Sequence, residues 1–169
     1  MKPDIYWIKG PWSGRLAVLA RPRGNDWLAD EIAGWQTSGV EVVVSLLTDE
    51  ENAELGLSDE ADIAQRNGLT FISYPINDYS VPSSREATFQ LVRKLEDLLS
   101  RGGSIGIHCR QGIGRSSLIA ACVLATSGKS VEEGFERIGN ARGLTVPDTR
   151  EQRDWVGDFA NQLLTNIAS

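Results

Sequence analysis

One short segment of the chain carries the residue types that phosphate chemistry requires. It reads His108-Cys-Arg-Gln-Gly-Ile-Gly-Arg115-Ser, so a cysteine and an arginine are separated by five residues that include two glycines. A cysteine thiolate is a strong nucleophile, and the planar guanidinium of arginine can hold two phosphoryl oxygens at once. The segment therefore predicts a nucleophile, Cys109, and an oxyanion-binding cation, Arg115, in one loop.

The flanking sequence places this loop between a strand and a helix. The strand is expected over 104–108 and an apolar helix over 115–126. Glycines let the loop curl so that several N–H groups point at one centre, where the helix amino terminus adds partial positive charge. Such a cradle binds a phosphate dianion and lowers the pKa of a cysteine at the strand end. The expected phosphate-binding residues are Arg110, Gln111, Gly112, Ile113, Gly114 and Arg115.

The neighbours of the loop have predicted roles of their own. Ser116 is expected to donate its hydroxyl toward the sulfur, which helps the thiolate leave in a second step. His108, the only histidine, is expected to order the loop as a core imidazole and not to act as a general base. Cys122 lies among apolar residues of the following helix and is expected to pack in the core. One histidine and two dispersed cysteines predict no metal site and no cofactor.

The same loop has alternative interpretations. A buried structural cysteine beside a glycine turn would give a similar pattern. An ATP-type phosphate loop does not fit, because no Gly-Lys-Ser/Thr follows the glycines. Enzymes that handle sulfur or arsenate also use Cys-x5-Arg loops, but they need no proline-flanked acid loop. A non-enzymatic phosphate-binding domain and a lipid phosphatase remain as rival functions.

Asp78 is the predicted general acid. It follows an expected strand over 70–74, and in a parallel sheet this edge also holds Cys109, after a neighbouring strand. A carboxylic acid there could protonate the leaving oxygen and then act as the base for water. The alternative for Asp78 is an ordinary Asn-Asp turn. Asp49 and Glu86 are weaker candidates, since each sits at an expected helix start where a carboxylate already has a capping role.

Taken together, these motifs resemble the cysteine-dependent protein tyrosine and dual-specificity phosphatase superfamily. The run His108 to Ser116 is similar to its signature loop, Pro75 to Pro82 to its mobile general-acid loop, and Leu118 to Leu124 to the helix after the signature loop. The spacing looks most similar to the kinase-associated phosphatase branch, over about residues 4–165.

The segment Thr149-Arg-Glu-Gln152 resembles the family's late segment, which in many members places a glutamine near the attacking water. This sequence has Asp148 where the family often has another glutamine. Two interpretations of Gln152 therefore stay open. It positions water, or it only closes a capping box with Thr149 at the start of the last helix.

The resemblance implies a metal-independent phosphomonoester hydrolase with a cysteinyl-phosphate intermediate. Its substrate would be a phosphorylated protein or peptide. Because no long insert precedes the first expected helix, a deep cleft is not expected. We therefore expect phosphotyrosine to be preferred with measurable phosphothreonine turnover, and Tyr79 could stack on the substrate ring.

Composition sets the remaining expectations. The chain has 169 residues, 41% of them apolar, which suits one domain over 1–169. A net charge of −6 argues against general nucleic-acid binding. The sequence has no signal pattern and no apolar run of about 18 residues, so we expect a cytoplasmic protein without membrane insertion.

Alternating strands and helices predict an α/β fold with a mostly parallel central sheet and helices on both faces. A hairpin is expected over 5–8 and 15–20, and buried strands over 40–46 and 70–74. Trp27 and Trp35 are expected to pack in the core. Helices are expected from Asn25 or Asp26 to Gly39, and over about 49–54, 58–66, 84–99, 115–126, 130–142 and 149–163.

Overall fold

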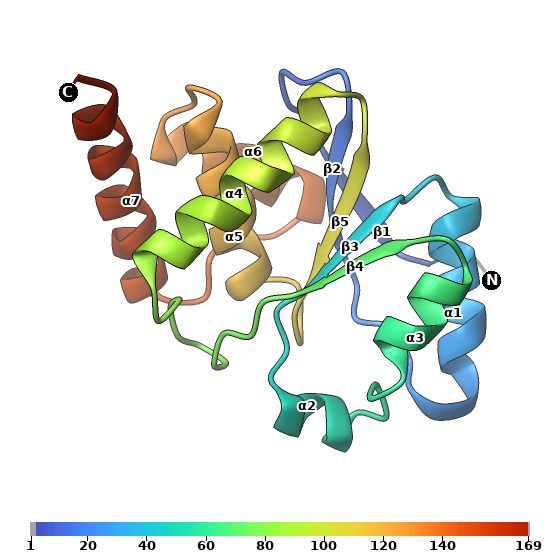
Figure 1. Cartoon of the computed structure of the whole chain (residues 1–169). Helices are drawn as coiled ribbons and strands as arrows, with labels where there is room; N and C mark the ends of the chain where they lie inside the picture. Colours follow the sequence, from blue (N-terminus) through green and yellow to red (C-terminus); the bar gives the residue numbers. More distant parts are fainter. Residues whose placement is uncertain (1–2, 169) are drawn as a thin grey trace.

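A computed structural model describes residues 3–168, and its centre is a five-stranded sheet in the order β1-β2-β5-β3-β4 (Figure 1). The strands β2, β5, β3 and β4 run parallel, whereas β1 is antiparallel to β2. The predicted α/β class and amino-terminal hairpin are thereby confirmed. The strand bounds are β1 Ile5–Ile8, β2 Arg15–Leu19, β3 Val42–Ser45, β4 Thr70–Ser73 and β5 Ser104–His108.

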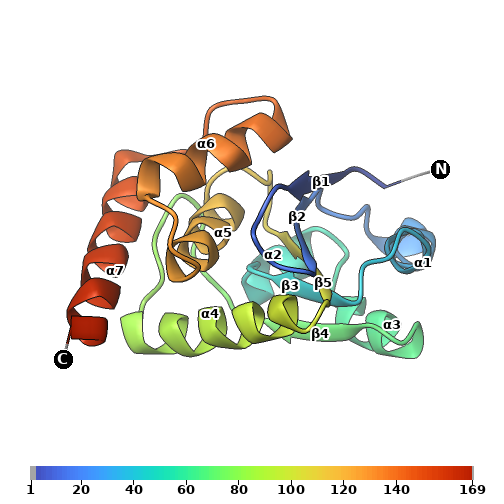
Figure 2. The same cartoon turned by 90° about the horizontal axis from the view of Figure 1, so that it is seen from above.

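Helices cover both faces of this sheet, as Figure 2 shows from above. The α1 and α3 helices lie on one face, and α4, α5, α6 and α7 lie on the other. Each face has its own apolar cluster, and the larger one lies under α4 to α7. The bounds are η1 Asn25–Trp27, α1 Leu28–Thr37, α2 Asp49–Glu54, α3 Glu60–Arg66, α4 Arg85–Ser100, α5 Arg115–Thr126, α6 Val131–Arg142 and α7 Arg150–Ala168.

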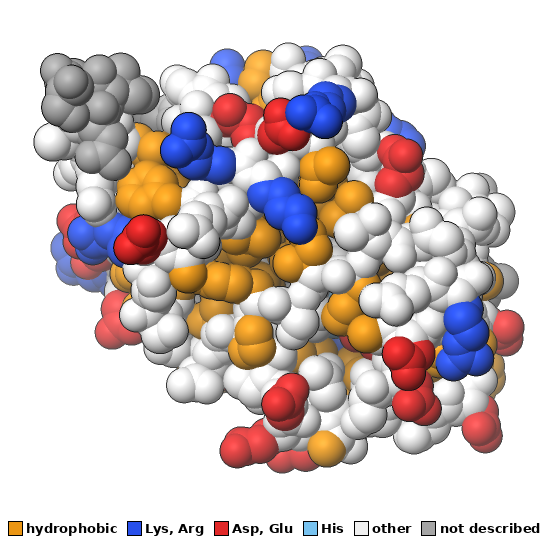
Figure 3. All heavy atoms as spheres, in the orientation of Figure 1, with side chains coloured by type: hydrophobic (Ala, Val, Ile, Leu, Met, Phe, Trp, Pro, Cys, Tyr) orange, Lys and Arg blue, Asp and Glu red, His pale blue; other side chains and the backbone are white. Residues whose placement is uncertain are grey.

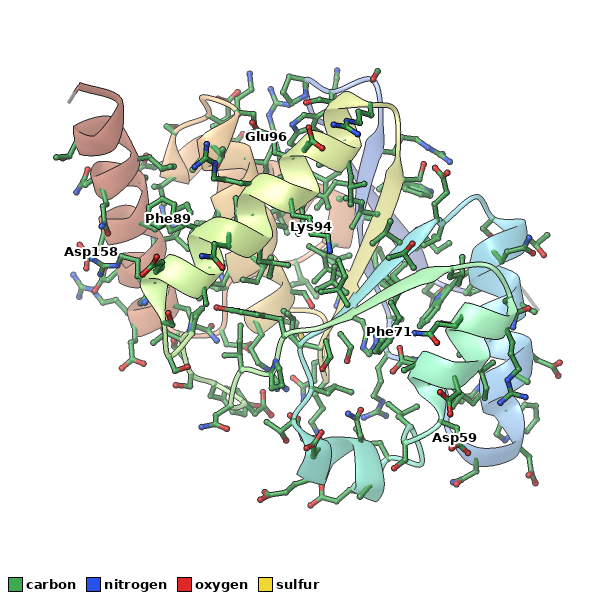
Figure 4. All side chains as sticks on the ribbon, viewed as in Figure 1. Asp59, Phe71, Phe89, Lys94, Glu96 and Asp158 are labelled. Atoms are coloured by element: carbon green, nitrogen blue, oxygen red, sulfur yellow. The ribbon has the colours of Figure 1, made fainter. Side chains whose placement is uncertain are left out.

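The α5 helix is the most deeply buried helix of the larger layer. Every residue from Arg115 to Leu124 is buried, because α4, α6 and α7 all pack against this helix. The layer is closed by aromatic stacking: Phe89 on α4 points toward α7 in Figure 4, and its ring lies 4.4 Å from that of Phe159. The start of α5, which follows the candidate loop, is thus held by rigid surroundings.

Side chains cap several of these helices, as their sequences predict. Thr48 and Glu51 form a reciprocal capping box at α2, while Ser84 and Ser130 accept hydrogen bonds from the first turns of α4 and α6. Gly143 ends α6 in the left-handed conformation. Within residues 3–168 no side chain caps α5, so the first N–H groups of this helix are left for another acceptor.

Two predictions about burial are wrong. The strand expected over 70–74 is β4, which lies at the edge of the sheet, so its residues are half-buried or exposed. Trp27 is 54% exposed rather than in the core, and its ring lies under the guanidinium of Arg23. Trp35 is buried as expected. Apolar residue types alone do not tell an edge strand from a central one, or a tryptophan at a helix start from one in the core.

The surface near α2 is acidic. Figure 3 shows acidic side chains at the lower edge of the molecule, where Figure 1 places α2. Within the described part of the chain, no helix is long and apolar enough to cross a membrane.

Candidate active site

The candidate phosphate loop connects the carboxyl end of β5 to the amino end of α5. Cys109 follows the last residue of β5, and Arg115 is the first residue of α5. Gly112 has φ of +70°, a conformation that favours glycine, and its N–H donates to Cys109 Sγ at 3.3 Å. The loop therefore curls back over its own cysteine, and an amide and the uncapped start of α5 lie beside the sulfur.

Gly114 is required by close packing. A Cβ atom at this position would lie 2.3 Å from Asp148 Oδ2 and 2.8 Å from the side-chain amide of Gln152. Those two residues precede and begin α7. The segment before α7 is thus pressed against the end of the phosphate loop.

Arg142 holds the outer side of the loop. It donates to the carbonyl oxygens of Gly112 at 2.8 Å and Gln111 at 3.2 Å, and its guanidinium lies 4.3 Å from the ring centre of Tyr6. Bonds that draw carbonyl oxygens outward leave the N–H groups of the same peptides free to point inward. This brace was not foreseen from the sequence, where Arg142 only ends a helix.

Arg115 is fixed by acceptors on α2 and on the loop after β4. Its Nη1 and Nη2 donate to Glu51 at 2.7 and 2.9 Å, and Nη1 also donates to the carbonyl of Ile76 at 2.7 Å. Its Nη2 lies 3.0 Å from Asp78 Oδ1. The guanidinium is 1% exposed, yet its Nε has no partner among the described residues. A buried donor without a partner is rare, so this N–H is available to an incoming oxyanion.

The ionisation of this cluster follows from its contacts. Burial opposes the charge of Glu51, but hydrogen bonds from Arg115 and Thr48 and the charge of Arg115 outweigh it and lower the Glu51 pKa. Burial also opposes the charge of Arg115, but Glu51, Cys109 and Asp78 together raise the pKa of Arg115. Arg115 is therefore a permanent cation in a buried site.

Asp78 lies on the loop between β4 and α4, beside Arg115. Its Oδ1 accepts from the N–H of Tyr79 at 3.0 Å, and Tyr79 has φ of +58°. A left-handed bulky residue stores strain, and such strain often marks functional loops. The structure thus brings Asp78 to the phosphate loop, whereas Asp49 and Glu86 stay at helix starts, as their sequence positions predict.

His108 lies in the core below the loop. Its Nε2 lies 2.6 Å from Glu60 Oε2, and the ring is tilted against Trp35 at 5.8 Å. His108 Nδ1 and Glu60 Oε1 have no partner among the described residues, although both side chains are buried. The Nε2 atom of His108 therefore faces Glu60 on α3 and not solvent, which fits a role in ordering the loop.

The remaining predicted residues lie in the core or at the start of α7. Ser116 is fully buried and its hydroxyl has no partner among the described residues, so the predicted hydrogen bond to the Cys109 sulfur is not formed in this structure. Gln152 accepts from the N–H groups of Asp148 and Thr149 and donates to the carbonyl of Ser80. Cys122 is buried, and burial raises its thiol pKa well above the usual value, so it stays protonated at neutral pH.

Glu51 and Glu60, like Arg142, are residues whose contacts sequence analysis missed. Glu51 has a capping box that explains it locally, so its second role toward Arg115 was hidden. Glu60 stands in an acidic stretch from Asp49 to Asp62 that looks like a solvated surface. The available signal was that Glu51 and Glu60 lie in the connection between β3 and β4, and that the carboxyl end of β3 lies beside β5.

Comparison with known proteins places the chain among phosphatases. A family described as "Polymorphic toxin system, DSP-PTPase phosphatase" matches residues 17–129. The rat protein named cyclin-dependent kinase inhibitor 3 is 25% identical over 136 residues, which are 79% of this chain and 64% of that protein. A putative tyrosine phosphatase of Invertebrate iridescent virus 3 is 38% identical over 91 residues, or 50% of this chain and 38% of the viral protein. The chain thus spans less than two thirds of these relatives.

Solved phosphatase structures share the fold of this chain. A kinase associated phosphatase with its catalytic-site cysteine replaced by serine superposes with a TM-score of 0.89 at 21% identity over 97% of both chains. The active form of Tk-PTP superposes with a TM-score of 0.76 at 27% identity, over 95% of this chain and 99% of the other. The resemblance to tyrosine and dual-specificity phosphatases, and to the kinase-associated branch, is confirmed.

Proposed function

Since the chain belongs to the DSP-PTPase phosphatase family, we propose that it hydrolyses phosphate monoesters on proteins through a cysteinyl-phosphate intermediate on Cys109. The observation that carries the proposal is the arrangement at the start of α5. A thiol, a loop amide and a buried guanidinium with a free N–H meet there. Each can serve a different atom of one phosphoryl group.

In the first half-reaction the Cys109 thiolate attacks phosphorus. The S–P bond forms while the ester P–O bond breaks, and its electron pair goes to the leaving oxygen. Asp78 gives that oxygen a proton. Arg115 and the loop N–H groups stabilise the equatorial oxygens, which is the largest electrostatic task in phosphoryl transfer.

In the second half-reaction water attacks the cysteinyl phosphate. The P–O bond forms, the S–P bond breaks, and the electron pair returns to sulfur. Ser116 would donate to the departing thiolate by a rotation of its buried hydroxyl, which no partner among the described residues holds. No step requires a metal ion or an organic cofactor.

The test is a comparison of two cysteine variants. Cys109→Ser should abolish turnover of an aryl phosphate, because a serine hydroxyl stays protonated at neutral pH. Cys122→Ser should keep wild-type activity, since that thiol is buried in α5. Wild-type activity should persist in EDTA and be inhibited by vanadate. Metal-restored activity after chelation, or an active Cys109→Ser protein, would contradict the proposal.

We further propose that phosphotyrosine is the preferred substrate, with slower phosphothreonine turnover. Tyr79 is 55% exposed next to Asp78, where its ring could stack on the substrate ring. Matched peptides that differ only at the phosphorylated residue test this through kcat/KM. Absence of phosphothreonine turnover would contradict the proposal that the site is shallow. A clear preference for phosphoinositides would contradict the proposal that the substrate is a protein. Binding of phosphopeptides without turnover would instead indicate a phosphate-binding domain.

A further inference from the structure

A second carboxylate lies at the rim of the phosphate loop. Asp148 is exposed as a residue, but its Oδ2 is pressed against Gly114, the residue before Arg115. It comes from the segment before α7, whereas Asp78 comes from the loop after β4. Two carboxylates therefore reach the same loop from two different segments of the fold.

The two carboxylates differ in what they already bind. Asp78 Oδ1 accepts from the N–H of Tyr79 and pairs with Arg115. The carboxylate of Asp148 has no hydrogen-bond or ion-pair partner in the described range 3–168. Its lone pairs are thus available to a water molecule, while those of Asp78 are partly occupied.

The electrostatic surroundings favour Asp148 as a base. Partial burial and the negative charge of Asp78 raise the pKa of Asp148, and the opposing charge of Arg115 does not cancel this. These are the charged groups that face it, from the acid loop and from α5. A carboxylate with a raised pKa accepts a proton more readily than an ordinary aspartate.

Gln152 is poorly placed to position the water itself. Its side chain is fully buried, its oxygen accepts from two backbone N–H groups, and its nitrogen donates to Ser80. These bonds link the start of α7 to the acid loop and orient Asp148. The Gln152 side-chain amide would therefore have to break these hydrogen bonds in order to bind water.

We infer that Asp148 is a second catalytic carboxylate, which accepts the proton of the water that hydrolyses the cysteinyl phosphate. This rests on the proposed function. Water oxygen attacks phosphorus, the S–P electron pair returns to Cys109, and one water proton moves to an Asp148 oxygen, which releases it to solvent before the next turnover. Asp78 acts in the first half-reaction, where it protonates the leaving group. The two half-reactions thus use two different carboxylates.

Rapid-mixing kinetics with an aryl phosphate separate the half-reactions. In Asp148→Asn, release of the aryl alcohol should show a burst of one equivalent per active site, followed by a steady-state kcat about 10²-fold below wild type. Its kcat/KM should stay within about twofold, because that ratio reports only the steps through leaving-group release. Asp154→Asn, at an exposed aspartate on α7 six residues further along the chain, is the matched control and should behave as wild type.

Asp148→Glu keeps a carboxylate and should recover much of the rate of cysteinyl-phosphate hydrolysis. If only the size of the Asp148 side chain mattered, the longer glutamate would not restore this rate. A steady state of Asp148→Asn equal to that of Asp154→Asn would overturn the inference. So would a loss of kcat/KM that grows with the basicity of the leaving group, since this would make Asp148 the first-step acid. If wild-type protein released no aryl alcohol at all, the proposed function itself would fail.

Discussion

Two buried acid–base pairs support the phosphate loop, and they are built differently. Glu51 on α2 holds Arg115 through two short hydrogen bonds from its two carboxylate oxygens. Glu60 on α3 meets His108 through a single contact, and an oxygen of Glu60 and a nitrogen of His108 stay unpaired. A bidentate pair fixes an orientation as well as a charge. A single contact positions the His108 ring but leaves one buried polar atom on each side chain without a partner among the described residues.

The difference suggests a division of tasks. The Glu51–Arg115 pair fixes the direction of the cation that meets the phosphoryl group. The Glu60–His108 pair fixes, from the core side, the residue that directly precedes Cys109. Substitutions that remove one charge from each pair, while keeping its shape, compare the two tasks directly.

The largest effect is expected for Glu51→Gln. An uncompensated guanidinium would remain in a buried site, so the free energy of unfolding should fall by about 3–5 kcal/mol. The kcat/KM for an aryl phosphate should fall roughly 10²-fold or more, because the donors lose their fixed direction. Denaturant unfolding and steady-state kinetics measure both.

Glu54→Gln is the matched control, because Glu54 is on the same helix with its side chain 65% exposed and contacts only Arg110 at 3.5 Å. An exposed pair contributes less than about 1 kcal/mol. Equal losses for Glu51→Gln and Glu54→Gln would mean that general acidity of α2, and not the bidentate contact, supports the loop.

Glu60→Gln should have a smaller effect on stability, about 1–3 kcal/mol, because an amide can still accept the hydrogen bond from His108. His108 directly precedes Cys109, and its ring is held by this contact, so weakening the contact should let the ring shift and should slow alkylation of Cys109 by iodoacetamide several-fold at neutral pH. Unchanged alkylation in the variant would show that the Glu60–His108 contact does not support the reactivity of Cys109.

The smallest effect is expected in the acid stability of the protein. The pKa of Glu51 is lower in the folded state than its ordinary value of 4.5, so its contribution to stability is present above pH 4.5 and is lost as pH falls through the folded value. Unfolding at a series of pH values should show a steeper loss below about pH 4.5 for wild type than for Glu51→Gln. Parallel curves would show that Glu51 is not ionised by its contact with Arg115.

Local patterns explain how much of this site could be predicted. Cys109, the glycines and Arg115 follow one another in sequence, so a strand, a turn and a helix suffice to place them. Asp78 required one further rule, that parallel strands end at the same edge, and the structure brings it 3.0 Å from Arg115. Its catalytic role stays a prediction.

Residues that act across long sequence separations could not be predicted. Glu51, Glu60 and Arg142 reach the loop from α2, α3 and α6, and no local pattern distinguishes them from capping or surface residues. The edge position of β4 was missed for the same reason, since strand order depends on packing between distant segments. Asp148 was visible only as a departure from a family pattern, and its free carboxylate required the structure.

Phosphoryl transfer to Cys109 is the first step of the proposed reaction, and trapping the cysteinyl phosphate tests it most directly. Wild-type protein turning over an aryl phosphate is quenched in acid, digested and examined by mass spectrometry. We expect one added phosphoryl group on the peptide that contains Cys109, more of it in Asp148→Asn, and none in Cys109→Ser. Full turnover with an unmodified Cys109 peptide, or a phosphoryl group on another residue, would contradict a cysteinyl-phosphate intermediate on Cys109.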